Sequence, residues 1–165
     1  MLNPVLRPLC PRASQKSFFS TSIDPNELMK VYVFTNDWSV HKLLLRHKDC
    51  PDTLTEKFLE CPVWYMRLTA GLAKKNRHRH IATLFSDKKS TVRAAAYKTA
   101  ITDNLYDMTM VCRMIIADKW VHGYFYGMYW NIELLTRIAS GEIDRESWEH
   151  EAHLQDARRL RLTLG

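Results

Sequence analysis

The sequence predicts an all-α protein of six to seven helices, arranged as a single bundle or an array of α-hairpins after a disordered or cleaved N-terminal leader. The chain has 165 residues, only five of them glycine, and its last proline is Pro62. Because glycine and proline punctuate turn-rich β folds, their scarcity favours helices. Apolar residues also recur three or four positions apart, which is the spacing of a buried helical face.

The leader is recognised by its composition. Residues 1–23 contain no Asp or Glu and carry Arg7, Arg12 and Lys16 among hydroxyl and apolar residues. This composition is typical of a mitochondrial transit peptide, and the alternative is a disordered basic tail. Without these three charges, 21 Lys and Arg residues face 18 Asp and Glu residues, so the net charge falls from +6 to +3. We therefore expect a transit peptide over 1–23 and a single helical domain over 24–165.

The first two helices are marked by their capping residues. Residues 24–27 (Asp-Pro-Asn-Glu) supply an N-cap, a proline in the first turn and an acid, which together predict a helix start. The competing interpretation is a strand over 31–34, but the sequence offers no convincing partner strand. Asn36 and Asp37 predict a break, with Asp37 capping a second helix through Leu45.

A proline separates the next two predicted helices. Thr53 and Glu56 have the spacing of a capping box, which predicts a short helix after Pro51. That helix should end at Cys61, because the residue before a proline avoids helical angles. Pro62 then suits the first turn of a helix that continues to about residue 72.

The C-terminal half predicts three further helices. Ser90 caps a long helix whose apolar stripe continues to Ile115, and residues 102–104 are expected to fray it without breaking it. A second long helix is expected over 121–139, with Gly141 as its C-cap. Asp144 is expected to cap a charged terminal helix that reaches about residue 162 and is mostly solvated or lies along a partner.

A basic patch spans residues 74–98, where eight Lys and Arg residues face the single acid Asp87. It is expected to end one helix and to begin a short one through Ile81 and Leu84. Such a run can neutralise the phosphates of RNA or of anionic lipid. The simpler alternative is a solvated helix face, and the scarcity of nearby aromatic residues favours it. The candidates for binding an anion, RNA or lipid are Lys74, Lys75, Arg77, Arg79, Lys88, Lys89 and Arg93.

An aromatic block follows the long helix and holds more rings than one core stripe needs. Trp and Tyr are favoured anchors of protein interfaces, and they also form belts at membrane surfaces. A thick protein core is the alternative explanation. The candidates for a partner interface are Trp120, Tyr124, Tyr126, Tyr129 and Trp130.

The sequence predicts no catalytic residue, cofactor or metal site. It contains no phosphate-binding loop, dinucleotide-binding motif or nucleophile elbow, and the pair His150 and His153 is one residue short of the zincin spacing. Cys50 and Cys61 lack metal-ligand spacing, so we expect free thiols, with a disulfide as the alternative. No apolar run reaches the roughly 18 residues of a membrane-spanning helix.

These observations predict a non-catalytic helical interaction protein, an accessory subunit or assembly factor of a mitochondrial respiratory or ATP synthase complex. Its expected location is the matrix or the matrix face of the inner membrane, and its expected partners are other protein subunits of that complex. One alternative is a mitoribosomal or RNA-associated protein that binds through 74–98. Another is a peripheral inner-membrane protein that binds anionic lipid, and an enzyme with an unrecognised site ranks last.

Overall fold

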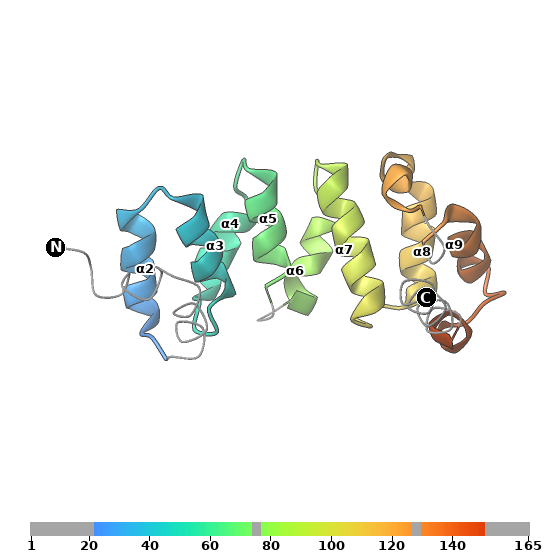
Figure 1. Ribbon diagram of the computed structural model, residues 1–165, viewed down its shortest axis with the longest axis horizontal. Coiled ribbons are helices and arrows are strands. Elements are labelled where there is room, and N and C mark those ends of the chain that lie inside the picture. The colour runs from blue at the N-terminus through green and yellow to red at the C-terminus, as the bar shows by residue number, and fades with distance from the viewer. Residues whose placement is uncertain (1–21, 74–76, 127–129, 151–165) are drawn as a thin grey trace, which may run out of the picture. The chain divides into compact units, whose positions relative to one another are not determined.

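The computed structural model describes residues 22–73, 77–126 and 130–150, and every regular element within these ranges is helical (Figure 1). The predicted all-α class is therefore confirmed. The chain divides into two compact units, which we call the N-terminal unit (Met1–Val92) and the C-terminal unit (Arg93–Gly165). The single domain expected over 24–165 stays a prediction.

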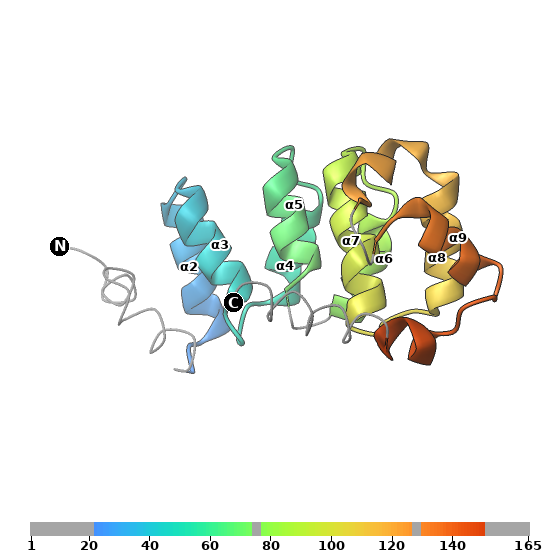
Figure 2. The ribbon, with the colours of Figure 1, turned by 45° about the vertical axis from the view of Figure 1, so that its right-hand side comes forward.

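The N-terminal unit is built around α5. Its helices are α2 (Pro25–Phe34), α3 (Trp38–Arg46), α4 (Asp52–Leu59), α5 (Trp64–Gly71) and α6 (Arg77–Leu84). Helix α5 packs against α3, α4 and α6, and α2 packs against α3. Figure 2 shows α2 beside α3 and α4 beside α5.

Two predicted caps define the first helices. The Asp24 carboxylate accepts a hydrogen bond from the backbone N–H of Asn26 at 2.8 Å and begins α2. The Asp37 carboxylate accepts from the N–H of Ser39 at 2.8 Å and begins α3. Each bond satisfies an amide that has no partner inside its own helix, so both breaks are specified locally.

The boundaries of α4 and α5 differ from those predicted. Helix α4 begins after Pro51 without a side-chain cap, so the capping box expected at Thr53 does not form. Helix α5 begins at Trp64 instead of Pro62. The reason is that the carbonyls of Cys61 and Pro62 accept hydrogen bonds from a side chain, the guanidinium of Arg67, instead of opening the helix.

The core of the N-terminal unit is built mainly from apolar side chains. Its largest fully buried side chains are Leu28, Leu44, Leu45, Leu54, Met66, Ile81 and Leu84. Gly71 lets α5 and α6 approach closely, because a Cβ at that position would lie 2.4 Å from a Leu84 methyl carbon. Cys50 and Cys61 are buried in this core and form no disulfide with each other, as expected.

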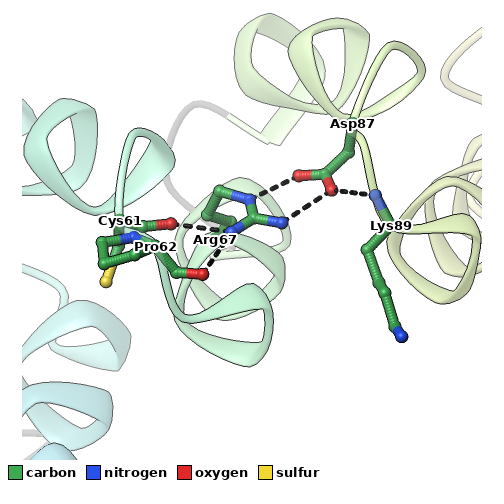
Figure 3. A network of polar contacts seen from close by, with 5 residues as sticks. All are labelled: Cys61, Pro62, Arg67, Asp87 and Lys89. Atoms are coloured by element: carbon green, nitrogen blue, oxygen red, sulfur yellow. Dashed lines mark hydrogen bonds and ion pairs between the residues drawn. The ribbon is translucent and has the colours of Figure 1, made fainter.

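A buried ion pair joins α5 to the segment that follows α6 (Figure 3). Arg67 Nε and Nη2 donate to the two carboxylate oxygens of Asp87 at 2.6 and 2.8 Å. Arg67 Nη1 donates to the carbonyls of Cys61 and Pro62 at 2.7 and 3.0 Å. Asp87 Oδ1 also accepts from the backbone N–H of Lys89 at 2.8 Å, so one pair orders two connecting segments, the one before α5 and the one after α6.

The protonation of Asp87 reflects the balance between burial and this pairing. Burial by itself disfavours the carboxylate and raises its pKa. The hydrogen bonds from Arg67 and Lys89 and the charge of Arg67 outweigh that effect, so the pKa of Asp87 lies below its ordinary value of 3.8. The carboxylate is therefore ionised at neutral pH and the pair is charged.

The C-terminal unit is centred on α8. Its elements are α7 (Ser90–Thr102, which begins before the unit boundary), α8 (Met108–Ala117), the 3₁₀-helix η2 (Lys119–Tyr124) and α9 (Ile132–Ala139). Helix α8 packs against both α9 and η2. Residues 145–150 begin a further helix, and the rest of the predicted terminal helix lies outside the described residues.

The long helix predicted from Ser90 to Ile115 is broken, and the expectation that residues 102–104 only fray it is wrong. Asn104 adopts a φ of 51°, a left-handed conformation that asparagine tolerates better than most residues. The amides of Asn104 and Leu105 then bond back to the carbonyls of Ile101 and Ala100 at 3.2 and 3.0 Å, which is a Schellman C-cap. Asp107 starts α8 by accepting from the Met110 amide at 2.7 Å.

The second long helix, predicted over 121–139, is also divided. Its first part is the short η2, and Asn131 caps the separate helix α9 by accepting from the Leu134 amide at 2.7 Å. The predicted ends are confirmed: Gly141 has a φ of 82° after α9, and Asp144 accepts from the Ser147 amide at 2.7 Å. These divisions give eight complete α-helices and one 3₁₀-helix in the described ranges, besides the start of a further helix at 145–150, where six to seven helices were predicted. Of the helices in these ranges, none combines the length and apolar character needed to cross a membrane.

The Arg67–Asp87 pair generates the first prediction. Replacing Arg67 with Met keeps a long apolar side chain but leaves Asp87 buried without its cation. We expect the free energy of unfolding, measured by urea denaturation at pH 7, to fall by about 3–5 kcal/mol. A second variant, Arg67→Met with Asp87→Asn, should recover part of that loss because no unpaired charge remains buried.

The matched control is Arg79→Met. Arg79 pairs with Glu56 at 3.0 Å, but both side chains are exposed, so its removal should cost less than about 1 kcal/mol. Equal losses from Arg67→Met and Arg79→Met would contradict a special role for the buried pair.

Candidate functional site

Large aromatic side chains are exposed along η2 and just after it. Trp120 is 83% exposed and Tyr126 is 78% exposed, while Tyr124 lies at the margin between half-buried and exposed. Trp130, also a predicted interface residue, instead packs between the rings of Phe125 and Trp148. Tyr129 lies outside the described residues. Of the five predicted interface residues, the structure thus brings three to the surface of one short segment.

The backbone that carries the exposed rings is held in place by buried side chains. Val121 and Phe125 are buried, so apolar anchors precede and follow the centre of η2. The backbone amide of Val121 donates to the carbonyl of Asp118 at 3.0 Å, which sets the first turn. Trp120 and Tyr126 therefore point into solvent from a held backbone and not from a loose loop. We call residues 118–126 the aromatic segment.

An ion pair holds the start of the aromatic segment. Arg93 Nε and Nη2 donate to the carboxylate oxygens of Asp118 at 2.5 and 3.0 Å, and both side chains are mostly buried. The hydrogen bond from Arg93 is the largest of several effects that lower the pKa of Asp118 below its ordinary value of 3.8. Burial opposes that shift, and the backbone N–H of Trp120 adds to it. The pair thus ties α7 to the residue that precedes η2.

His122 provides a second tie. Its Nε2 lies 3.0 Å from the carbonyl oxygen of Ile115 and 3.2 Å from that of Ile116. Because carbonyl oxygens only accept, Nε2 carries the hydrogen and donates to the C-terminal end of α8. That end of a helix has carbonyls without intrahelical partners, so His122 acts as a side-chain cap for α8.

Lys98 supports the end of the aromatic segment, a role that the sequence did not suggest. Its Nζ donates to the carbonyl of Tyr124 at 2.6 Å and lies 5.1 Å from the ring centroid of Phe125 and 5.8 Å from that of Trp130. Burial lowers the pKa of Lys98. Lys98 and Tyr124 are 26 positions apart, so no local sequence pattern predicts the contact.

Several residues of the predicted basic patch make separate contacts within the protein. Arg93 belongs to the C-terminal unit and is paired with Asp118, and Arg77 Nε donates to the Leu72 carbonyl at 3.0 Å. Arg79 is exposed and paired with Glu56. Lys88 and Lys89 are exposed beside the buried Asp87, and Lys74 and Lys75 lie outside the described residues. The patch residues that the structure describes thus do not form a set of unpaired cations.

Cys112 has the properties of a core residue. It is fully buried, and burial, with a smaller contribution from Asp107, raises the pKa of its thiol to about 12. A thiol that remains protonated at neutral pH is a poor nucleophile. In the ranges 22–73, 77–126 and 130–150, the structure contains no group of three or more His, Cys, Asp or Glu side chains placed to hold a metal ion.

Comparison of the chain with protein-family models, with curated proteins and with solved structures gives no match in any of the three.

The Arg93–Asp118 pair generates a pH prediction. The folded-state pKa of Asp118 lies below its ordinary value of 3.8. The ionised carboxylate therefore stabilises the fold at pH values above 3.8, and this contribution is lost as the pH falls from there through the lower pKa of the folded state. Asp118→Asn should therefore lower the free energy of unfolding by about 1.5–3 kcal/mol at pH 7. The difference between the variant and the unmodified chain should shrink steadily as the pH is lowered below about 4.

The control for this measurement is Glu142→Gln. Glu142 pairs with Arg137 at 2.7 Å in the same unit, but both side chains are about half exposed, so we expect a loss of less than about 1 kcal/mol at any pH. Asp118→Asn would contradict the assignment if its effect were as small as this control or did not change with pH.

Proposed function

We propose that this chain is a non-catalytic helical interaction protein, an accessory subunit or assembly factor of a mitochondrial respiratory or ATP synthase complex. The aromatic segment is its contact surface. The observation that carries the proposal is the exposure of Trp120 and Tyr126 on a backbone held by buried groups. Single exposed apolar residues are common on proteins, but two nearly bare large aromatic rings on one short fixed segment are not.

The chemistry of these residues suits binding to another protein. Trp and Tyr bury a large area while losing few rotatable bonds, and they are enriched among the residues that dominate interface energies. A surface that is already ordered loses less conformational entropy on binding. The ties from Arg93 and Lys98 supply that order before any partner arrives.

The cellular location in this proposal rests on the composition of the leader. Residues 1–23 are free of acids and carry three cations, which is typical of import into mitochondria. The proposed location is the matrix or the matrix face of the inner membrane. The leader is outside the described residues except for Ser22 and Ile23.

The first test measures partner binding. The tagged full chain, purified from mitochondria, should carry stoichiometric protein partners that survive ribonuclease treatment. Trp120→Ala with Tyr126→Ala should reduce their recovery at least about tenfold, because hot-spot residues each contribute about 2 kcal/mol or more. The same variant should unfold within about 0.5 kcal/mol of the unmodified chain, since both rings are exposed.

The control is Phe34→Ala, which removes another exposed ring, 80% exposed, from the N-terminal unit. It should leave partner recovery unchanged. Recovery that falls with ribonuclease or with Lys88→Ala and Lys89→Ala would favour the RNA-associated alternative. Dependence on cardiolipin vesicles would favour the lipid-binding alternative, and either result would overturn the proposal.

The second test measures targeting. Residues 1–23 fused to a fluorescent protein should accumulate in mitochondria, because an acid-free cationic segment is drawn towards import receptors and a negative matrix. Substituting Arg7, Arg12 and Lys16 with Gln should leave the fusion in the cytosol. A diffuse distribution of the unmodified fusion would contradict the assigned location while leaving the contact surface untouched.

A further inference from the structure

A recess in the N-terminal unit has the composition of a ligand site. It lies among the end of α2, the start of α3 and the end of α4, and its volume is about 460 Å³. Ligand pockets in proteins are typically concave, partly apolar and of about 300–1,000 Å³. The side chains that line it include those of Tyr32, Trp38, His41, Lys57, Phe58 and Glu60.

His41 is one of the residues that line this recess, and its side chain carries an unusual polar atom. Its side chain is buried, with the residue only 5% exposed, and its Nε2 lies 2.9 Å from the carbonyl oxygen of Thr35. A carbonyl oxygen only accepts, so Nε2 carries the hydrogen, and in the neutral imidazole Nδ1 is then an acceptor. In the described part of the chain, this buried Nδ1 makes no hydrogen bond.

Aromatic rings surround the same imidazole. The ring centroids of Tyr32, Phe58 and Trp38 lie 5.1, 5.2 and 5.5 Å from that of His41. These rings supply apolar contact, and Asn36, Lys57 and Glu60 add polar groups to the lining of the recess. A buried water typically requires two to four polar partners, and the rings beside Nδ1 offer few, so a donor on an aromatic ligand satisfies this acceptor better.

The charged residues of the recess indicate a ligand without net charge. Lys57 and Glu60 both line it and carry opposite charges, and Lys57 Nζ also lies 5.7 Å from the ring centroid of Tyr32. Trp38 is 39% exposed, so one wall of the recess is reached from solvent. A flat neutral molecule therefore has both a path in and complementary walls.

We propose that this recess binds a small neutral aromatic molecule that carries an N–H or O–H donor on its ring system, with the donor bonded to Nδ1 of His41. Indole and phenol are the simplest members of this class. The site is independent of the aromatic segment and of the function proposed above.

The experiment compares two probes that differ only in the donor. Indole and 1-benzofuran have the same fused-ring shape, but an oxygen replaces the N–H in benzofuran. Isothermal titration of the full chain should show indole binding at least about tenfold more tightly, because benzofuran leaves the buried acceptor unpaired. Equal affinities, or no binding of either probe in the millimolar range, would overturn the proposal.

Variants of the recess then test whether indole bonds to His41. His41→Phe keeps a ring but removes the acceptor. The affinity for indole should therefore fall to the level of that for benzofuran, and the affinity for benzofuran should not change. A preference for indole that survives in His41→Phe would exclude the assigned bond.

A second variant keeps the test valid if His41→Phe does not fold. Trp38→Leu removes one wall of the recess and should weaken the binding of both probes. Trp64→Leu, at a site 38% exposed in the same unit but outside the recess, is the matched control and should weaken neither. Equal responses of the two Trp variants would place the probes elsewhere and contradict the proposal.

Discussion

The buried pair between Arg67 and Asp87 is the constraint on which the N-terminal unit depends. Taking two charges out of water is unfavourable, and their attraction offsets the loss only when the remaining hydrogen-bonding capacity is satisfied. Here it is: the guanidinium also bonds the carbonyls of Cys61 and Pro62, and the carboxylate also accepts the Lys89 amide. The pair therefore specifies where α5 begins and how the segment after α6 turns, two features that apolar burial alone leaves undetermined.

The C-terminal unit uses the same device for a different purpose. Arg93 reaches the Asp118 carboxylate, which also accepts a backbone amide, that of Trp120. In both units a carboxylate thus combines a local amide bond with a distant arginine. In the C-terminal unit the result is a short 3₁₀-helix whose exposed rings are held in place. Arg93, which the sequence makes one candidate for binding an anion, instead pairs with Asp118 and helps to hold the aromatic segment.

The sequence predicted those features that depend on neighbouring residues. The caps at Asp24, Asp37 and Asp144 and the left-handed Gly141 are local, and each was found where its residue type predicted it. The break at Asn104 was not predicted, because the local sequence around an asparagine that frays a helix does not differ from that around one that ends it. The tertiary packing of α8 decides between the two outcomes. The aromatic block was predicted as a surplus of rings, but no periodicity separates exposed Trp120 from packed Trp130, since the segment is not the long helix that was assumed. The recess around His41 was not predicted, because Tyr32, His41 and Phe58 come from three different helices.

Two of several departures from the usual regularities of a folded chain bear on function; the buried atoms Nε2 of His80 and Nη1 of Arg145 and the exposed ring of Phe34 are others. Natural sequences satisfy their buried polar atoms and bury their largest apolar side chains, so exceptions to these rules mark positions selected for something other than stability. The unpaired Nδ1 of His41 is an exception of the first kind, and the bare ring of Trp120 is one of the second. Each lies beside a well-satisfied element: His41 is itself bonded through Nε2, and Trp120 follows the paired Asp118. The surrounding bonds hold each exception in a single conformation, and a group held in one conformation is what a binding site requires.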